Sequence, residues 1–171
     1  MNTRMLVINA VLAAVYALLT VALAPFSYGP VQVRLSEVLT LLAFYQPKVV
    51  PGLILGCLLA NLASPFGMID IVVGTFATAI AVYGMRYMPN IWTASLLPVV
   101  SNGVLIGAEL AYLGALEGES VGLTMLYIAA GEFVAVSVLG CVLMPLLWRN
   151  TAFRKLFPHQ ILELQFFLPN P

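Results

Sequence analysis

The sequence predicts an all-α integral membrane protein, a bundle of six transmembrane helices. Hydrophobic residues make up 62% of its 171 positions and charged residues only 8%. A soluble domain typically carries about 25% charged residues, whereas uncharged apolar stretches of about 20 residues mark bilayer-spanning helices. Proline, glycine and charged residues interrupt the apolar pattern and divide it into six stretches. The composition thus excludes a soluble domain, and the net charge of +0 gives no sign of nucleic-acid binding.

The predicted helices follow one another with short connections, in a single domain over residues 1–171. The first, residues 5–24, is long enough to span the hydrocarbon and stops at Pro25, so we interpret it as a membrane helix and not as a signal peptide. The others cover residues 33–45, 49–63, 68–87, 91–116 and 121–148, and a cytoplasmic tail follows at 149–171. The second and third are short for a full span, which predicts that they are tilted or shielded by protein.

The distribution of charge predicts the orientation. If the N-terminus is cytoplasmic, six crossings place nearly all basic residues on the cytoplasmic side, as the positive-inside rule requires. These residues are Arg4, Lys48, Arg86, Arg149, Arg154 and Lys155, while Asp70, Glu117 and Glu119 fall outside. We therefore expect a multi-pass protein of the plasma membrane with both termini in the cytoplasm. Arg34 breaks the pattern and needs another reason for its position.

Polar side chains within the apolar stretches gather toward the predicted outer side. Such residues are unfavourable in lipid, so they usually face a cavity or a partner helix. The set comprises Arg34, Glu37, Asn61, Asp70, Glu109 and, about 16 Å into the last helix at 1.5 Å per residue, Glu132. Arg34 and Glu37 stand three residues apart, so they either form a surface salt bridge or are separated by a polar ligand.

A polar stripe follows one face of the fifth helix. Ser95, Asn102 and Glu109 repeat every seven residues and so fall near one line along the helix. Such a stripe either bonds neighbouring helices together or lines a binding site. We assign Ser95 to interhelical bonding. Asn102, Glu109 and Glu132 are assigned to ligand binding, and for the two acids the reason is that a buried carboxylate without a partner is strongly unfavourable.

Small side chains form a ridge on the first helix. Ala10, Ala13, Ala14 and Ala17 recur at spacings of three and four residues, which allows another helix to approach closely. The ridge serves either internal packing or docking of a partner subunit. Cys57 and Cys141 lie in apolar helices without metal-ligand spacing, and we interpret both as buried small hydrophobes.

Several classes of function lack their motifs. The sequence has no phosphate-binding glycine loop that ends in lysine and serine or threonine, so ATP hydrolysis is not expected of this chain. Its single histidine, His159, lies in the polar tail, which argues against a zinc site or a histidine relay. We expect no catalytic residues, metal or cofactor, and an enzyme would have to rely on carboxylates alone.

Together, six short-looped helices, the alanine ridge and the outward polar pocket resemble the substrate-binding S component of energy-coupling factor (ECF) transporters. More narrowly, three segments resemble the QueT family, which is assigned to uptake of queuosine precursors. They are Tyr-Gly-Pro-Val-Gln-Val-Arg-Leu-Ser-Glu at 28–37, Pro-Gly at 51–52 and Leu-Ala-Asn-Leu-Ala-Ser-Pro-Phe-Gly-Met-Ile-Asp at 59–70.

The resemblance implies partners and a substrate. The partners are a transmembrane coupling protein (EcfT), docked on the alanine ridge, and two cytoplasmic ATPases that use the ATP. The substrate is a 7-deazaguanine such as queuine, preQ1 or preQ0, whose N–H groups match carboxylates and whose keto oxygen needs a donor such as Asn or Arg. Phe66 and Tyr112 either stack on this base or only pack. The alternatives are an S component for riboflavin or thiamin, a small proton-coupled secondary transporter, and an intramembrane enzyme.

Overall fold

A computed structural model describes residues 2–116 and 118–157. All the regular structure in this part of the chain is helical, which confirms the all-α prediction. The elements are α1 Thr3–Ala22, α2 Ala24–Ser27, η1 Leu35–Leu41, α3 Leu42–Tyr45, η2 Pro47–Val49, α4 Val50–Asn61, α5 Met68–Met85, α6 Ile91–Tyr112, α7 Val121–Glu132, η3 Phe133–Gly140, α8 Cys141–Arg149 and α9 Thr151–Leu156. Of the residues discussed above, Glu117 and His159 lie outside the described ranges.

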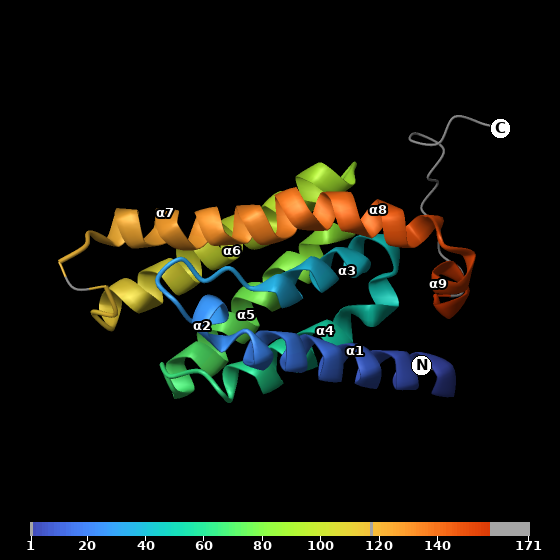
Figure 1. The fold of residues 1–171 in the computed structure, drawn as a ribbon, viewed down its shortest axis with the longest axis horizontal. Coiled ribbons are helices and arrows are strands. Elements are labelled where there is room, and N and C mark those ends of the chain that lie inside the picture. Colours follow the sequence, from blue (N-terminus) through green and yellow to red (C-terminus); the bar gives the residue numbers. More distant parts are fainter. Residues whose placement is uncertain (1, 117, 158–171) are drawn as a thin grey trace.

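The helices lie side by side along the long axis (Figure 1). The start of α1 and helices α8 and α9 lie at one end, which we call the termini end. The turn from α4 to α5 and the turn from α6 to α7 lie at the other, which we call the loop end. In contact order, α1 packs on α4, α4 on α5, α5 on α6 and α6 on α7. The segment η1 contacts α1, α4, α5, α6 and η3, so it occupies the middle of the bundle.

The prediction of six spanning helices is confirmed only in part. Within the described residues, four helices are long and apolar enough to cross a membrane, namely Thr3–Ala22, Met68–Met85, Ile91–Tyr112 and Val121–Arg149. Two shorter apolar helices, Leu35–Tyr45 and Pro47–Asn61, lie between the first and second of them. The shorter pair corresponds to the stretches predicted at 33–45 and 49–63.

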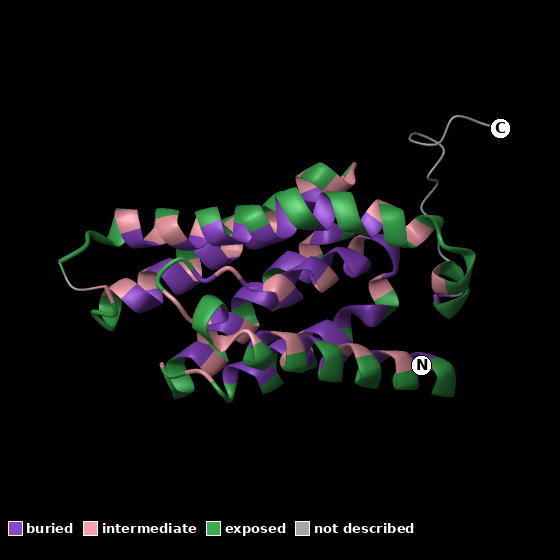
Figure 2. Cartoon of the chain, viewed as in Figure 1, coloured by how far each residue is buried: buried purple, intermediate pink, exposed green. Residues whose placement is uncertain are grey.

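The first short helix differs from the prediction in its conformation. Its first turns are 3-10 helix, from Leu35 to Leu41, and it begins two residues late because the backbone at Arg34 is extended (φ −90°, ψ 100°). A 3-10 helix rises about 2.0 Å per residue against 1.5 Å in an α-helix, so the segment reaches further than its length suggests. Leu41, Leu42 and Ala43 are no more than 1% exposed. The predicted shielding by protein is therefore observed (Figure 2).

Local chemistry sets the ends of the longer helices. The side chain of Asn90 accepts from Thr93 N at 2.9 Å and starts α6 with a capping box. We predicted that this helix continues to residue 116, but it ends at Tyr112 because Gly114 adopts a positive φ of 64°. The last span, Val121–Arg149, contains a π-helix over Phe133–Gly140 that the sequence pattern does not reveal.

Glycines allow two helix pairs to approach closely. A Cβ atom added at Gly56 of α4 would lie 2.7 Å from Tyr16 Cβ of α1, and one at Gly107 of α6 would lie 2.5 Å from Met125 Cα of α7. Small residues at such contacts are typical of helix packing in membranes. Large apolar side chains on the outer faces are exposed, among them Leu18, Val72, Val100, Leu126 and Val142. This arrangement suits a lipid environment, where apolar groups face outward.

Candidate functional site

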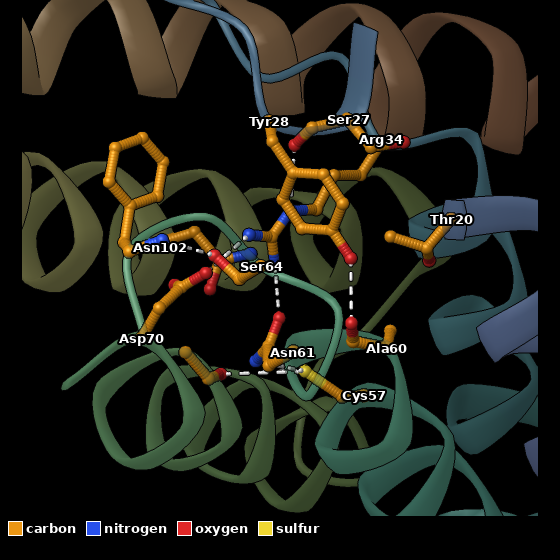
Figure 3. A network of polar contacts seen from close by, with 12 residues as sticks. Thr20, Ser27, Tyr28, Arg34, Cys57, Ala60, Asn61, Ser64, Asp70 and Asn102 are labelled. Atoms are coloured by element: carbon orange, nitrogen blue, oxygen red, sulfur yellow. Dashed lines mark hydrogen bonds and ion pairs between the residues drawn. The ribbon is translucent and has the colours of Figure 1, made fainter. Parts of the chain in front are cut away.

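Arg34 lies at the centre of a buried polar network near the loop end, with only 1% of its surface exposed (Figure 3). Its Nε donates to the carbonyl oxygen of Ser27 at 3.2 Å, and its Nη1 donates to Asn61 Oδ1 at 3.3 Å. Its Nη2 lies 3.6 Å from Asp70 Oδ2 in an ion pair. The guanidinium also lies over the Tyr28 ring, 5.5 Å from the centroid. These partners explain why the one basic residue that breaks the charge pattern is retained.

Three elements converge to build this network. The extended backbone at Arg34 directs the chain into η1, Asn61 ends α4, and Asp70 lies in the first turn of α5. An acidic residue is favourable at this helix position because the backbone N–H groups point toward it. Gly67, with φ 73°, makes the turn between α4 and α5. A Cβ atom at Gly74 would lie 2.7 Å from Asn61 Nδ2, so the lack of a side chain there makes room for the amide.

Glu37 belongs to a second buried group that ties η1 to its neighbours. The Tyr16 hydroxyl of α1 donates to Glu37 Oε1, and Thr78 Oγ1 of α5 donates to the same oxygen at 3.4 Å. One turn away, the hydroxyls of Thr20 and Ser36 lie 2.6 Å apart. Glu37 is fully buried. The central segment is thus held on two sides by hydrogen bonds from hydroxyl groups.

Asn102 and Glu132 form a third buried group, between α6 and the last span. Asn102 Nδ2 donates to Glu132 Oε1 at 2.9 Å, and neither residue is more than 1% exposed. Glu132 lies close enough to Glu37 and Arg34 to interact electrostatically with both. It is also the last residue before the π-helix, a feature often found at functional sites.

Glu109 completes the set of buried acids. It is 6% exposed and lies within electrostatic range of Asp70 and Arg34. Within the described ranges, the buried charged residues are therefore Arg34 and the four acids Glu37, Asp70, Glu109 and Glu132. One guanidinium cannot balance four ionised carboxylates, so this region either holds protons or favours a cationic ligand.

Many polar atoms of these groups have no hydrogen-bond partner within the described residues. They include Ser27 Oγ, Gln32 Nε2 and Oε1, Arg34 Nη2, Glu37 Oε2, Asp70 Oδ1 and Oδ2, Asn102 Oδ1, both Glu109 oxygens and Glu132 Oε2. Native proteins pair the great majority of buried polar atoms, because an unpaired one destabilises by about 1–3 kcal/mol. A cluster of such atoms, most of them acceptors, suits a ligand rich in N–H groups.

Most of the predicted site residues are brought together, but the two aromatic ones are not. Tyr112 is 86% exposed, and Phe66 is half-buried and packs on the cluster that contains Ile106 and Leu110. The backbone N–H of Phe66 donates to Ser64 Oγ at 3.2 Å, but its ring packs on this apolar cluster. The surface salt bridge considered for Arg34 and Glu37 is wrong, because both are buried and Arg34 pairs with Asp70 instead.

The polar stripe on α6 serves two purposes. Ser95, Asn102 and Glu109 are all buried, as the seven-residue spacing predicts. Ser95 Oγ lies 2.9 Å from Ser137 Oγ, which confirms its assignment to interhelical bonding. Cys57 is buried as predicted, although its sulfur also lies 3.2 Å from Thr78 Oγ1 and takes part in the polar network.

The alanine ridge is divided between two faces of α1. Ala13 is 2% exposed and packs against α4 beside Gly56, so internal packing accounts for it. Ala10 and Ala14 are exposed, and Ala17 is half-buried. The exposed members lie on a surface of α1 that a partner could reach.

The sequence-based site omitted Gln32 and Tyr16. Both are buried, and each contributes polar atoms to this region. Tyr16 and Thr20 lie four residues apart in an apolar helix, so they share one face. That spacing is the signal by which a polar face on this helix could have been predicted. Gln32 follows a Gly-Pro turn and carries no such signal, because its burial depends on the path of the loop.

Comparison with known proteins identifies the family. The family model described as QueT transporter matches residues 6–149, which is most of the chain. A protein of Lactococcus lactis subsp. cremoris (strain MG1363), named Queuosine precursor transporter QueT, is 38% identical over 81 residues, which cover 46% of this chain and 47% of that protein. The aligned region thus spans about half the length of this curated relative. No solved structure matches the chain. Because the family match extends over nearly all of the membrane helices, the chain belongs to the QueT transporter family.

Proposed function

We propose that this chain is the substrate-binding S component of an ECF-type importer and captures a queuosine precursor from outside the cell. The observation that carries the proposal is the set of four buried acids around Arg34, six of whose eight carboxylate oxygens lack a hydrogen-bond partner within the described residues. The relative named as a queuosine precursor transporter supports the same substrate class. The candidates are queuine, preQ1 and preQ0.

The chemistry of a 7-deazaguanine fits the atoms on offer. Its guanine-like edge presents two adjacent N–H donors, which match the two oxygens of a carboxylate such as Glu132 or Glu109. Its keto oxygen requires a donor from an amide or a guanidinium. The amine substituent of queuine and preQ1 is cationic at neutral pH, and the excess of buried acids would balance that charge.

The proposed membrane arrangement has six helices, the two short apolar ones included, with the loop end outside the cell. Both termini are then cytoplasmic, as the positive-inside rule requires. Energy would come from a transmembrane coupling protein and two ATPases, so this chain would bind no cofactor of its own.

The orientation can be tested with single cysteines, because Cys57 and Cys141 are buried. We expect a membrane-impermeant thiol reagent applied to intact cells to label Ser120→Cys and to miss Asn150→Cys. The reverse pattern would mean that the topology is inverted.

Ligand-induced heat stabilisation tests the function. Purified protein in detergent is heated with queuine, preQ1, preQ0, riboflavin or thiamin. A ligand at a hundred times its dissociation constant stabilises the folded state by about 2.7 kcal/mol. Stabilisation by a 7-deazaguanine alone supports the proposal, whereas stabilisation by riboflavin or thiamin alone indicates an S component for another vitamin.

Uptake measurements separate this proposal from a secondary transporter, which buried acids could also serve as proton relays. Cells that lack the coupling ATPases should not accumulate a labelled 7-deazaguanine. Accumulation that persists without them and collapses with the proton gradient would favour the secondary transporter. Chemical conversion of the substrate would instead favour an enzyme.

A further inference from the structure

Gln32 combines two features that are each unfavourable in a folded protein. Among the described residues, it is the one residue other than glycine with a positive φ, at 46°. Its side chain is 1% exposed, and neither its Nε2 nor its Oε1 has a hydrogen-bond partner in that part of the chain. A left-handed backbone at a residue other than glycine destabilises by about 1–3 kcal/mol and persists at functional sites when the surroundings enforce it.

The surroundings that enforce this conformation are visible. Gln32 N donates to the carbonyl oxygen of Gly29 at 3.2 Å and closes a turn. The same segment lies directly on α7, where a Cβ atom added at Gly131 would be 1.9 Å from Val31 O and 3.1 Å from the carbonyl carbon of Gln32. A side chain at Gly131 would therefore displace the loop. The residue after Gly131 is Glu132, so the loop that carries the strained residue packs on α7 one residue before a buried acid.

The unpaired groups of the loop, of α6 and of the last span are complementary in kind. Glu132 Oε2 and Asn102 Oδ1 are acceptors without a hydrogen-bond partner in the described ranges, whereas Gln32 adds an unpaired N–H donor as well as an acceptor. Acids alone can bind the N–H groups of a base but cannot bind its keto oxygen. The unpaired amide of Gln32, on the loop that packs on Gly131, can supply such a donor.

We propose that Gln32 is a substrate-contacting residue that determines specificity for a 6-keto base. Its Nε2 donates to the keto oxygen, its Oε1 accepts from an N–H group of the same molecule, and Gly131 positions the loop that carries it. The inference rests on the proposed function and narrows it. It predicts discrimination between a 7-deazaguanine and its 6-deoxo analogue, which lacks the 6-keto oxygen and the N1–H of the lactam.

Calorimetric titration of the full chain in detergent tests this inference. The ligands are preQ1 and its 6-deoxo analogue, the matching 2-amino-7-deazapurine with the same aminomethyl group. The variants are Gln32→Gly, which suits the positive φ and removes the amide, and Gln32→Glu, which replaces the donor with an acceptor. We expect the wild type to bind the analogue at least about tenfold more weakly than preQ1. Both variants should bind preQ1 at least about tenfold more weakly and discriminate less than wild type, and they retain only the part of the preference that a carboxylate bound to N1–H supplies.

Titration of the wild type distinguishes failure of the proposed function from failure of the role of Gln32. If wild type binds no 7-deazaguanine, the proposed function and the inference both fail. If wild type binds and discriminates, and both Gln32 variants discriminate equally well, the inference alone is overturned. If wild type binds preQ1 and the analogue equally, the keto oxygen is not read by Gln32, and the inference is again overturned.

Gly131 offers a matched pair of variants on one helix. Gly131→Ala places a methyl group against Val31 O, whereas Gly122 of α7 has open space around its Cβ position. We expect Gly131→Ala to weaken preQ1 binding at least about tenfold and to reduce discrimination against the analogue, with Gly122→Ala within about threefold of wild type. Equal affinities of the two folded variants would overturn the positioning role of Gly131.

Discussion

At two contacts in the molecule, a glycine without a side chain lets a buried polar segment pack closely against a helix. The two contacts differ in the hydrogen bonds that the polar side chain makes. Where α1 meets α4, a Cβ atom at Gly52 would lie 2.6 Å from Asn9 O, and Gly52 N donates to Asn9 Oδ1 at 2.6 Å. Asn9 Nδ2 donates to Met5 O at 2.8 Å and to Lys48 O at 3.0 Å. This buried amide is paired at both its oxygen and its nitrogen.

Where the loop meets α7, the glycine is Gly131 and the amide is that of Gln32, whose side chain has no hydrogen-bond partner within residues 2–116 and 118–157. Burial alone therefore does not identify a binding residue. An amide paired inside the fold stabilises it, whereas one left unpaired retains its hydrogen-bonding capacity for a ligand. The contrast separates a structural contact at α1 and α4 from the proposed binding contact at α7.

The largest effect is expected at Arg34, which belongs to the proposed binding region but has partners inside the fold. Replacing Arg34 by Met leaves the carboxylate of Asp70 buried without its ion pair, so the free energy of unfolding should fall by about 3–5 kcal/mol. Thermal and denaturant unfolding in detergent measure this loss. The double variant Arg34→Met with Asp70→Asn should recover part of it. A single variant within about 1 kcal/mol of wild type would contradict a structural role for the ion pair.

The next effect concerns affinity and not stability. Replacing Glu132 or Glu109 by Gln keeps the shape but turns one acceptor oxygen into a donor that faces a ligand N–H. We expect each change to weaken 7-deazaguanine binding by at least about 2 kcal/mol, roughly thirtyfold. Calorimetric titration measures this weakening.

Ser95→Ala is the control for the acid variants, because Ser95 lies on the same stripe but bonds to Ser137. Its affinity should stay within about threefold of wild type. If both Gln variants remain folded and bind as tightly as this control, the two glutamates are structural.

A smaller effect on stability is expected at Asn9, with no effect on binding. Asn9→Leu removes a buried amide that is paired to two backbone carbonyls and one backbone N–H, so it should lower the free energy of unfolding by about 1–3 kcal/mol. The dissociation constant for a 7-deazaguanine should not change. Unfolding and calorimetry on the same preparation measure both quantities. A loss of affinity without a loss of stability would mean that Asn9 acts in binding and not in the packing of α1 on α4.

Much of the fold could be predicted, because in lipid the apolar stretches and their breaks correspond closely to helices. The conformation inside the stretches could not. The 3-10 turns of Leu35–Leu41 and the π-helix of Phe133–Gly140 depend on packing among five or more elements, which leaves no periodic signal in the sequence. Gly114 can be read in the sequence, but the sequence does not show that its backbone adopts the left-handed conformation that ends α6.

The candidate site was predictable to the extent that charge in lipid demands a partner or a function. Seven of the polar residues predicted from the sequence are buried, and these include Arg34, Asp70 and Glu132. The aromatic residues were harder, because Tyr112 is apolar enough to occur on any face and proves to be 86% exposed. Gln32 was missed because a polar residue in a loop is ordinarily solvated, and only the close contact with Gly131 reveals that it is buried.

The smallest effect on the isolated protein is expected at Ala14, and comparison with Ala13 separates the two alanine faces of α1. Ala14 is exposed, so Ala14→Trp should leave both stability and ligand affinity unchanged. Ala13 is 2% exposed against α4, so Ala13→Trp should overpack the interior and destabilise the fold by about 1–3 kcal/mol or more. If the exposed face docks the coupling protein, Ala14→Trp should abolish co-purification of the complex, because small residues are needed for close helix approach in lipid. Co-purification at the wild-type level would assign this ridge to internal packing through Ala13 alone.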